Sequence, residues 1–289
     1  MLALLAVSLI WAFSFGLIGN TLAGVDPWFL AFARLGLSSL LFMPFMRVSG
    51  LKKKNMLELA SIGALQYGMM YGMLFLGFKY LQSHEVALFT ILTPIYVTLI
   101  NDLFRKKFHL VFLASALLAV LGTAVIKYRE ISSSEVMIGF GIIQISNLCF
   151  AAGQIWYRNA MKRLSHKQNR EIFALLYIGA ALVAGLFYLL MGDANGVKAI
   201  NLEQVKVIMY LGILASGVGF FLWNVGARQV NAGTLAVFNN IKIPLAIAVS
   251  ILVFGEEASI PRLFIGLALI LAALLMDEKK VGVQTKTED

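Results

Sequence analysis

The sequence predicts an all-α integral membrane protein in which ten transmembrane helices form two inverted repeats of five helices each. Three observations lead to this prediction: an extremely apolar composition, ten apolar stretches of membrane-spanning length, and a residue pattern that recurs 149 residues later. Of the 289 residues, 60% are hydrophobic and 13% are charged, whereas a soluble domain carries about 25% charged residues. We therefore exclude a soluble globular protein.

Apolar stretches follow one another along almost the whole chain. A transmembrane helix needs ~20 mostly apolar residues, and backbone groups in lipid must be hydrogen-bonded within the segment, which predicts helices throughout. The predicted spans cover residues 2–20, 28–46, 57–78, 84–104, 109–127, 136–157, 171–191, 205–225, 233–254 and 262–276. The first span follows no basic segment, so we expect a retained helix rather than a cleaved signal.

Basic residues predict the orientation of the spans. Sixteen lysines and arginines fall on one side, mainly in the loops at 47–54, 105–107 and 158–170 and in the tail 279–289, against six on the other side. Cytoplasmic loops carry the excess of positive charge. We therefore expect both termini in the cytoplasm, as an even number of spans requires.

An internal repeat divides the chain into two halves. Residues 77–89 align with residues 226–238 at an offset of 149, and Pro94 aligns with Pro244 at an offset of 150. We assign residues 1–130 to the first repeat and residues 131–278 to the second. Because each half has an odd number of spans, the halves must be inverted, which is a signature of transporters whose binding site lies between the halves.

Pro94 and Pro244 are the two prolines in span interiors, and they are repeat equivalents. Each removes one backbone hydrogen bond, which frees the carbonyl groups of Thr90 and Asn240. Interrupted helices at matching positions of two halves point to a transporter site or to gating elements. A simple packing kink is the alternative.

Lys242 lies in the middle of the ninth span, about ten residues from either end. A charged lysine at that depth costs at least ~2.5–3.5 kcal/mol, so it should face a cavity or a partner. Its ammonium group suits a substrate carboxylate. A structural ion pair with Asp102 or with a carboxylate at a span end is the alternative, and a desolvated lysine can also release its proton.

Polar and aromatic side chains inside other spans are the further candidates for substrate binding. Buried amides donate and accept hydrogen bonds at once, which suits a ureido or peptide-like group, and aromatic rings suit the walls of a slot for a flat ligand. These candidates are Asn239, Asn147, Gln66, Tyr67, Tyr71, Trp223 and Trp11. Each has a plain alternative as a helix-bridging or packing residue. Arg34 is expected to reach the interface or to neutralise a carboxylate.

Other functional classes lack their motifs. The three histidines lie at span edges without metal-ligand spacing, and the single Cys149 excludes an internal disulfide. We expect no metal, no cofactor and no nucleic-acid partner, since the basic residues lie in short loops. The expected partners are a small-molecule substrate and the lipid bilayer, with the protein a monomer or a weak homodimer.

Several segments resemble EamA-type carriers of the drug/metabolite transporter superfamily. They include residues 9–15, Arg34 early in the second span, and residues 254–256 after the ninth. Within the carboxylate/amino acid/amine branch, residues 64–71 and 88–94 resemble bacterial biotin importers of the inner membrane. Residues 144–147, 223–227 and 232–235 do so too.

This resemblance implies a ten-helix bundle with a central cavity lined mainly by spans 1, 3, 4, 6, 8 and 9. It implies a non-enzymatic secondary transporter that imports a small carboxylate, with biotin as the best candidate, by alternating access. An exporter of amino acids or other small metabolites with the same fold is the alternative. A membrane-embedded lipid-modifying enzyme would need a catalytic carboxylate or histidine cluster, which the sequence lacks.

Overall fold

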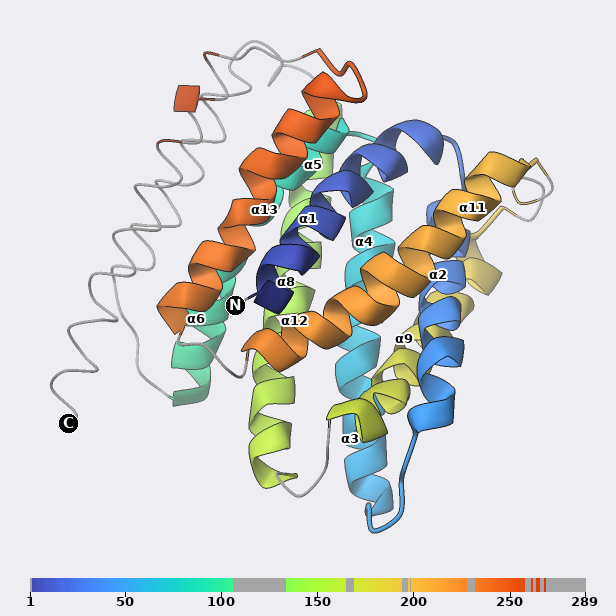
Figure 1. Cartoon of the computed structure of the whole chain (residues 1–289), viewed down its shortest axis with the longest axis vertical. Coiled ribbons are helices and arrows are strands. Elements are labelled where there is room, and N and C mark those ends of the chain that lie inside the picture. Colours follow the sequence, from blue (N-terminus) through green and yellow to red (C-terminus); the bar gives the residue numbers. More distant parts are fainter. Residues whose placement is uncertain are drawn as a thin grey trace, which may run out of the picture.

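The computed structural model describes residues 2–105, 134–164, 169–193, 199–227 and 232–257, together with positions 197, 261, 264, 265 and 268. The predicted span 109–127 lies outside the described residues, and only three positions of the span 262–276 lie within them. Every regular element in the described part of the chain is helical, in agreement with the predicted fold class (Figure 1).

The first half supplies four helical rods. The first two are α1 (Leu2–Gly16), extended by a π-helical turn η1 (Leu17–Thr21), and α2 (Pro27–Phe42), followed by a 3₁₀ turn η2 (Met43–Phe45). The third is α3 (Lys53–Gly63), η3 (Ala64–Met69) and α4 (Met70–Gly77), and the fourth is α5 (Ser83–Phe89), η4 (Thr90–Leu92) and α6 (Thr93–Arg105). Of these, η3 is π-helical and η4 is a 3₁₀ turn.

The second half supplies four more rods. They are α8 (Ser134–Arg163), α9 (Asn169–Met191), the α11–η5–α12 rod (Leu202–Tyr210, Leu211–Val218, Gly219–Ala227), and α13 (Ala232–Leu252). In the described residues six helices are long and apolar enough to cross a membrane. They cover Leu4–Thr21, Pro27–Phe45, Lys53–Gly77, Glu135–Arg163, Asn169–Met191 and Leu202–Gly226.

Local sequence sets where these helices begin. Asp26 accepts a hydrogen bond from the amide of Phe29 at 2.7 Å, and Pro27 follows at the first helical position. An aspartate cap followed by proline is a strong helix start. Gln82 and Glu85 form a reciprocal capping box at the start of α5, and Asn201 with Gln204 forms another at the start of α11.

Helix pairs pack closely where glycines remove side-chain bulk. The Gly63 of α3 lies against the backbone of Leu176 in α9, and Gly179 of α9 lies against the backbone of Ala60 in α3. Gly68 similarly approaches the backbone of Ala180. Small residues at helix interfaces allow this approach in membrane proteins.

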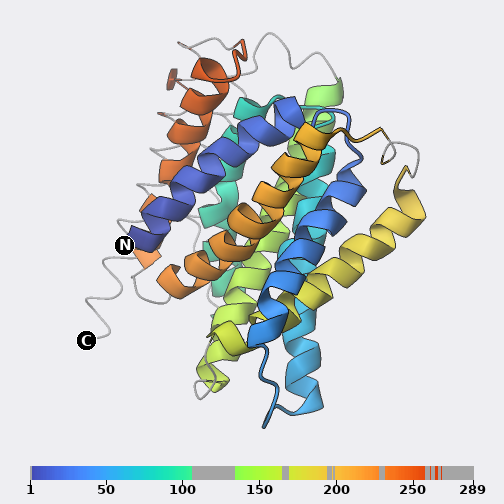
Figure 2. The ribbon, with the colours of Figure 1, turned by 45° about the vertical axis from the view of Figure 1, so that its right-hand side comes forward.

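Repeat-equivalent helices begin at matching positions and at opposite ends of the bundle. Leu202, which begins α11, lies 149 residues after Lys53, which begins α3; Ala232 of α13 lies 149 residues after Ser83 of α5. In Figures 1 and 2, α3 begins at the lower end and α11 at the upper end. The two π-helical segments η3 and η5 also fall at corresponding positions, because Val218 lies 149 residues after Met69.

A polar cluster joins three elements at the upper end of the bundle. Glu256, just after α13, contacts His84 Nδ1 at 2.8 Å and accepts a bond from the His84 amide at 3.1 Å. Asn20 of η1 donates to the other carboxylate oxygen at 3.0 Å. The cluster thus ties the end of α1, the start of α5 and the end of α13 together.

Candidate substrate cavity

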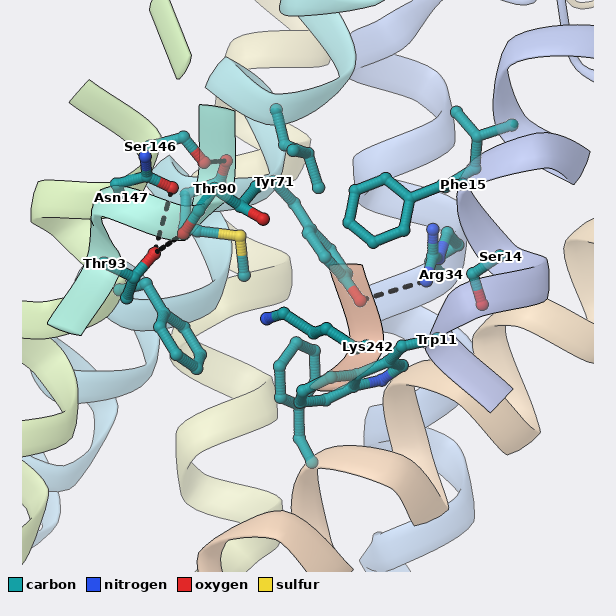
Figure 3. A pocket seen from close by; sticks show the side chains of 15 residues that line it. Trp11, Ser14, Phe15, Arg34, Tyr71, Thr90, Thr93, Ser146, Asn147 and Lys242 are labelled. Atoms are coloured by element: carbon teal, nitrogen blue, oxygen red, sulfur yellow. Dashed lines mark hydrogen bonds between the residues drawn. The ribbon is translucent and has the colours of Figure 1, made fainter. Parts of the chain in front are cut away.

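A cavity of about 600 Å³, including its opening, lies in the middle of the bundle. Its lining comes from α1, η1, α2, α4, η4, α6, α8, α12 and α13 (Figure 3). These elements include all six spans expected to line it, with α2 in addition. The site therefore gathers residues from both halves of the chain.

Lys242 lines this cavity and is 8% exposed. Its ammonium nitrogen lies 5.1 Å from the centroid of the Trp11 ring, within the range of a cation–π contact. Trp11 is itself oriented by a hydrogen bond from its indole nitrogen to the Ala215 carbonyl oxygen at 2.9 Å. The side chain of Asp102, the alternative partner for Lys242, lies outside the described residues.

Asn147 also lines the cavity, where it braces the interruption of the fourth span. Its amide nitrogen donates to the Phe89 carbonyl oxygen at 2.9 Å and to Gln144 Oε1 at 3.0 Å. Its amide oxygen faces the Thr93 hydroxyl at 3.2 Å. Because both amide hydrogens are used, Asn147 has only acceptor capacity left for a ligand.

The helix interruption at Pro94 has the expected consequence for its neighbours. The Thr90 carbonyl group that the proline frees lies 2.7 Å from the Thr93 hydroxyl, which donates to it. The structure differs at Pro244: α13 continues through this exposed proline as one helix. Loss of one hydrogen bond is evidently absorbed by the neighbouring bonds of the helix. The side chains of Asn239 and Asn240 lie outside the described residues.

The aromatic candidates divide into two groups. Tyr71 and Trp11 line the cavity. Tyr67 and Trp223 are fully buried but are not part of the lining. Tyr67 accepts a hydrogen bond from Asn224 at 2.8 Å, and Trp223 packs against Trp11 with ring centroids 5.0 Å apart.

Gln66 also stays outside the cavity lining. Gly153 of α8 packs closely against its side chain. Neither amide atom of Gln66 finds a hydrogen-bond partner among the described residues.

Arg34 is the lining residue whose role the sequence expectation missed. It is 2% exposed and lies inside the bundle, rather than reaching the membrane interface. Its Nε donates to Ser216 Oγ and its Nη2 to Tyr71 Oη, each at 3.0 Å. A charge within an apolar span was the available signal, the same one that singled out Lys242.

The electrostatics of the cavity are one-sided. Its lining in the described part of the chain contains the two basic residues Arg34 and Lys242 and no carboxylate. No group of three or more potential metal ligands occurs among the described residues. A partly apolar, aromatic cavity with two basic groups suits an organic anion.

Comparison with known proteins identifies the family. The profile described as "EamA-like transporter family" matches residues 1–128 and 137–276. The chain belongs to the EamA-like transporter family. It is therefore a multi-pass membrane protein, and as a transporter it moves its substrate without acting as an enzyme.

Two relatives match this EamA-like transporter over most of both chains. It is 42% identical to the "Probable biotin transporter" of Pseudomonas aeruginosa, over 94% of this chain and 95% of the relative. It is 38% identical to the "Biotin transporter" of Escherichia coli K12, over 98% of this chain and 94% of the relative.

A solved crystal structure shares the fold of this EamA-like transporter. The TM-score is 0.66 over 95% of each chain, at 18% sequence identity. This likeness extends to the arrangement of the helices but carries no information about the substrate.

Proposed function

We propose that this protein is a secondary transporter that imports biotin across the bacterial inner membrane. The observation that carries the proposal is the 38–42% identity, over more than nine tenths of the chain, with proteins named biotin transporters. The cavity agrees with it, because biotin combines a carboxylate with a compact ring system. Export of cationic amines fits poorly, since Arg34 and Lys242 would repel them.

We further propose that substrate binding involves Lys242, Asn147, Tyr71 and Trp11. Lys242 supplies a charge for the carboxylate, and the Asn147 amide oxygen supplies an acceptor. Asn239 belongs to the same proposal as a neighbour of Lys242 on α13. Tyr67, Trp223 and Gln66 then act indirectly, by supporting the walls of the cavity.

The proposed scaffold is a ten-helix bundle of two inverted repeats, residues 1–130 and 131–278, with both termini in the cytoplasm. Equal spacing of helix starts and the opposite directions of α3 and α11 support the inversion. The two separate family matches support a division into halves. Inverted halves around one site support alternating access, in which one half moves against the other.

The test is uptake of radiolabelled biotin in bacteria that lack their own biotin importer. We expect saturable uptake above that of cells with an empty vector, and competition by excess unlabelled biotin. Uptake no greater than the empty-vector background, with the protein present in the membrane, would overturn the proposal. Competition by amino acids instead of biotin would favour another carrier of this fold.

A further inference from the structure

Arg34 is held in one orientation while part of its guanidinium group stays unused. Ser216 and Tyr71 take Nε and Nη2, and the guanidinium carbon lies 4.6 Å from the Tyr71 ring centroid and 5.1 Å from that of Phe75. Nη1 is buried, yet no described residue accepts a hydrogen bond from it. Leaving such a donor unmade is costly, which indicates a group kept ready for a ligand.

A single free nitrogen restricts what Arg34 can recognise. A carboxylate bound by the fork of an arginine needs two nitrogens on one edge, but each edge of Arg34 that includes Nη2 already has a protein partner. Nη1 alone suits one carbonyl oxygen. The ammonium group of Lys242, a compact charge, has no such geometric restriction and suits a carboxylate.

The two basic groups point to different parts of the cavity. Figure 3 shows Arg34, Ser14 and Phe15 on one side, Asn147 and Thr93 on the opposite side, and the Lys242 side chain extending away from Arg34. Such a separation suits a ligand with polar groups at both ends.

Ser14 adds an acceptor on the Arg34 side of the cavity. Its hydroxyl donates its one hydrogen to the Ile10 carbonyl oxygen at 2.8 Å. Ser14 therefore offers only lone pairs to the cavity that it lines. A donor from Arg34 and an acceptor from Ser14 complement a ureido group, whose carbonyl accepts and whose N–H groups donate.

We propose that Arg34 is a specificity-determining residue that binds the ureido carbonyl oxygen of the ligand through Nη1, with Ser14 accepting from a ureido N–H. Lys242 binds the carboxylate at the other end. This inference rests on the proposed function, because it assigns the two ends of biotin to two sides of the cavity. It explains why a cavity for a monoanion carries two buried cations.

Three ligands separate the two ends in binding measurements on the purified full-length protein. The ligands are biotin, its methyl ester, which lacks the carboxylate charge, and iminobiotin, in which a protonated imino group replaces the ureido oxygen. The wild-type protein should bind biotin at least about tenfold more tightly than either analogue. Equal binding of iminobiotin and biotin by the wild-type protein overturns the assignment of Arg34 without any variant.

Variants then assign each preference to a residue. Arg34→Gln should weaken biotin binding by about 10- to 100-fold and abolish the preference over iminobiotin, while the preference over the methyl ester remains. Lys242→Gln should do the reverse. Arg47→Gln, at an exposed arginine outside the cavity, is the matched control and should change neither preference.

The outcomes distinguish the inference from the proposed function. If Arg34→Gln weakens biotin and iminobiotin equally, or neither, Arg34 only supports the fold and the inference fails while biotin transport stands. If the wild-type protein binds no biotin, the proposed function fails and the inference with it. If Arg34→Gln does not fold, the analogue series on the wild-type protein decides.

Discussion

Lys242 is the residue on which transport should depend most directly. Replacing it by methionine keeps the length of the side chain and removes a buried charge, so we expect a folded, inserted protein. Biotin uptake should fall to background, because losing one partner of a buried charge pair costs roughly 2–5 kcal/mol, or about 30-fold and more in binding. Uptake and membrane abundance are measured in parallel.

Lys52→Met is the matched control for Lys242→Met. It removes the same charge from an exposed lysine before α3 and should leave uptake unchanged. Normal uptake by the Lys242 variant would show that the cavity lysine has a structural role only.

The sequence located Lys242, Asn147, Tyr71 and Trp11, since a polar or aromatic group in a span is visible without coordinates. It could not separate Tyr71, which lines the cavity, from Tyr67, which is buried behind it. The two lie four residues apart, on one face of a regular helix. The π-helical segment η3 contains Tyr67 and widens the turn, which changes the face that each tyrosine presents.

At the level of single elements, most helices begin close to where the apolar pattern places them. The fourth span, predicted at 84–104, is observed from Ser83 to Arg105 with an interruption at η4. Pro94 announced that interruption. Nothing in the apolar pattern announced η3 and η5, because a π-helical turn depends on packing between helices rather than on a distinctive residue.

The contact between α3 and α9 should tolerate no added side-chain atom. A Cβ at Gly63 or Gly179 would overlap a backbone carbonyl oxygen of the other helix, and overpacking typically costs about 1–3 kcal/mol. We therefore expect Gly179→Ala to lower the midpoint of thermal unfolding of the purified protein. Gly36→Ala is the control, because no atom lies within 4 Å of its added Cβ; an equal change in both variants would contradict this packing.

The cluster around Glu256 predicts a dependence of stability on pH. Burial acts to raise the pKa of Glu256, but hydrogen bonds from His84 and Asn20 outweigh it and hold the pKa at about 2, below the ordinary 4.5. Since the pKa is lowered on folding, the carboxylate stabilises the protein above pH 4.5. That contribution is lost as pH falls toward about 2.

Thermal unfolding of the wild-type protein and of Glu256→Gln at several pH values tests this link. The wild-type protein should be more stable by a constant margin from about pH 8 to about pH 5, and the margin should shrink at lower pH. Glu257→Gln, at the exposed neighbour, should show no such margin. A margin that instead grows as pH falls would show that the charged form of Glu256 does not stabilise the fold.

At the scale of the whole molecule, the inverted arrangement makes a prediction about sidedness. Lys54 and Glu203 are exposed repeat equivalents near the starts of α3 and α11. In a parallel arrangement of the halves both would lie on the same side of the membrane. In the inverted arrangement Lys54 faces the cytoplasm with the basic loops, and Glu203 faces the opposite side.

Cysteines at these two positions distinguish the arrangements. In a Cys149→Ala background, a membrane-impermeant maleimide should label Glu203→Cys in intact spheroplasts and Lys54→Cys only after permeabilisation. The natural Cys149 is buried, so its replacement removes background labelling at little cost. Labelling of both cysteines from one side would exclude inversion, and with it the alternating-access mechanism in which one half of the chain moves against the other.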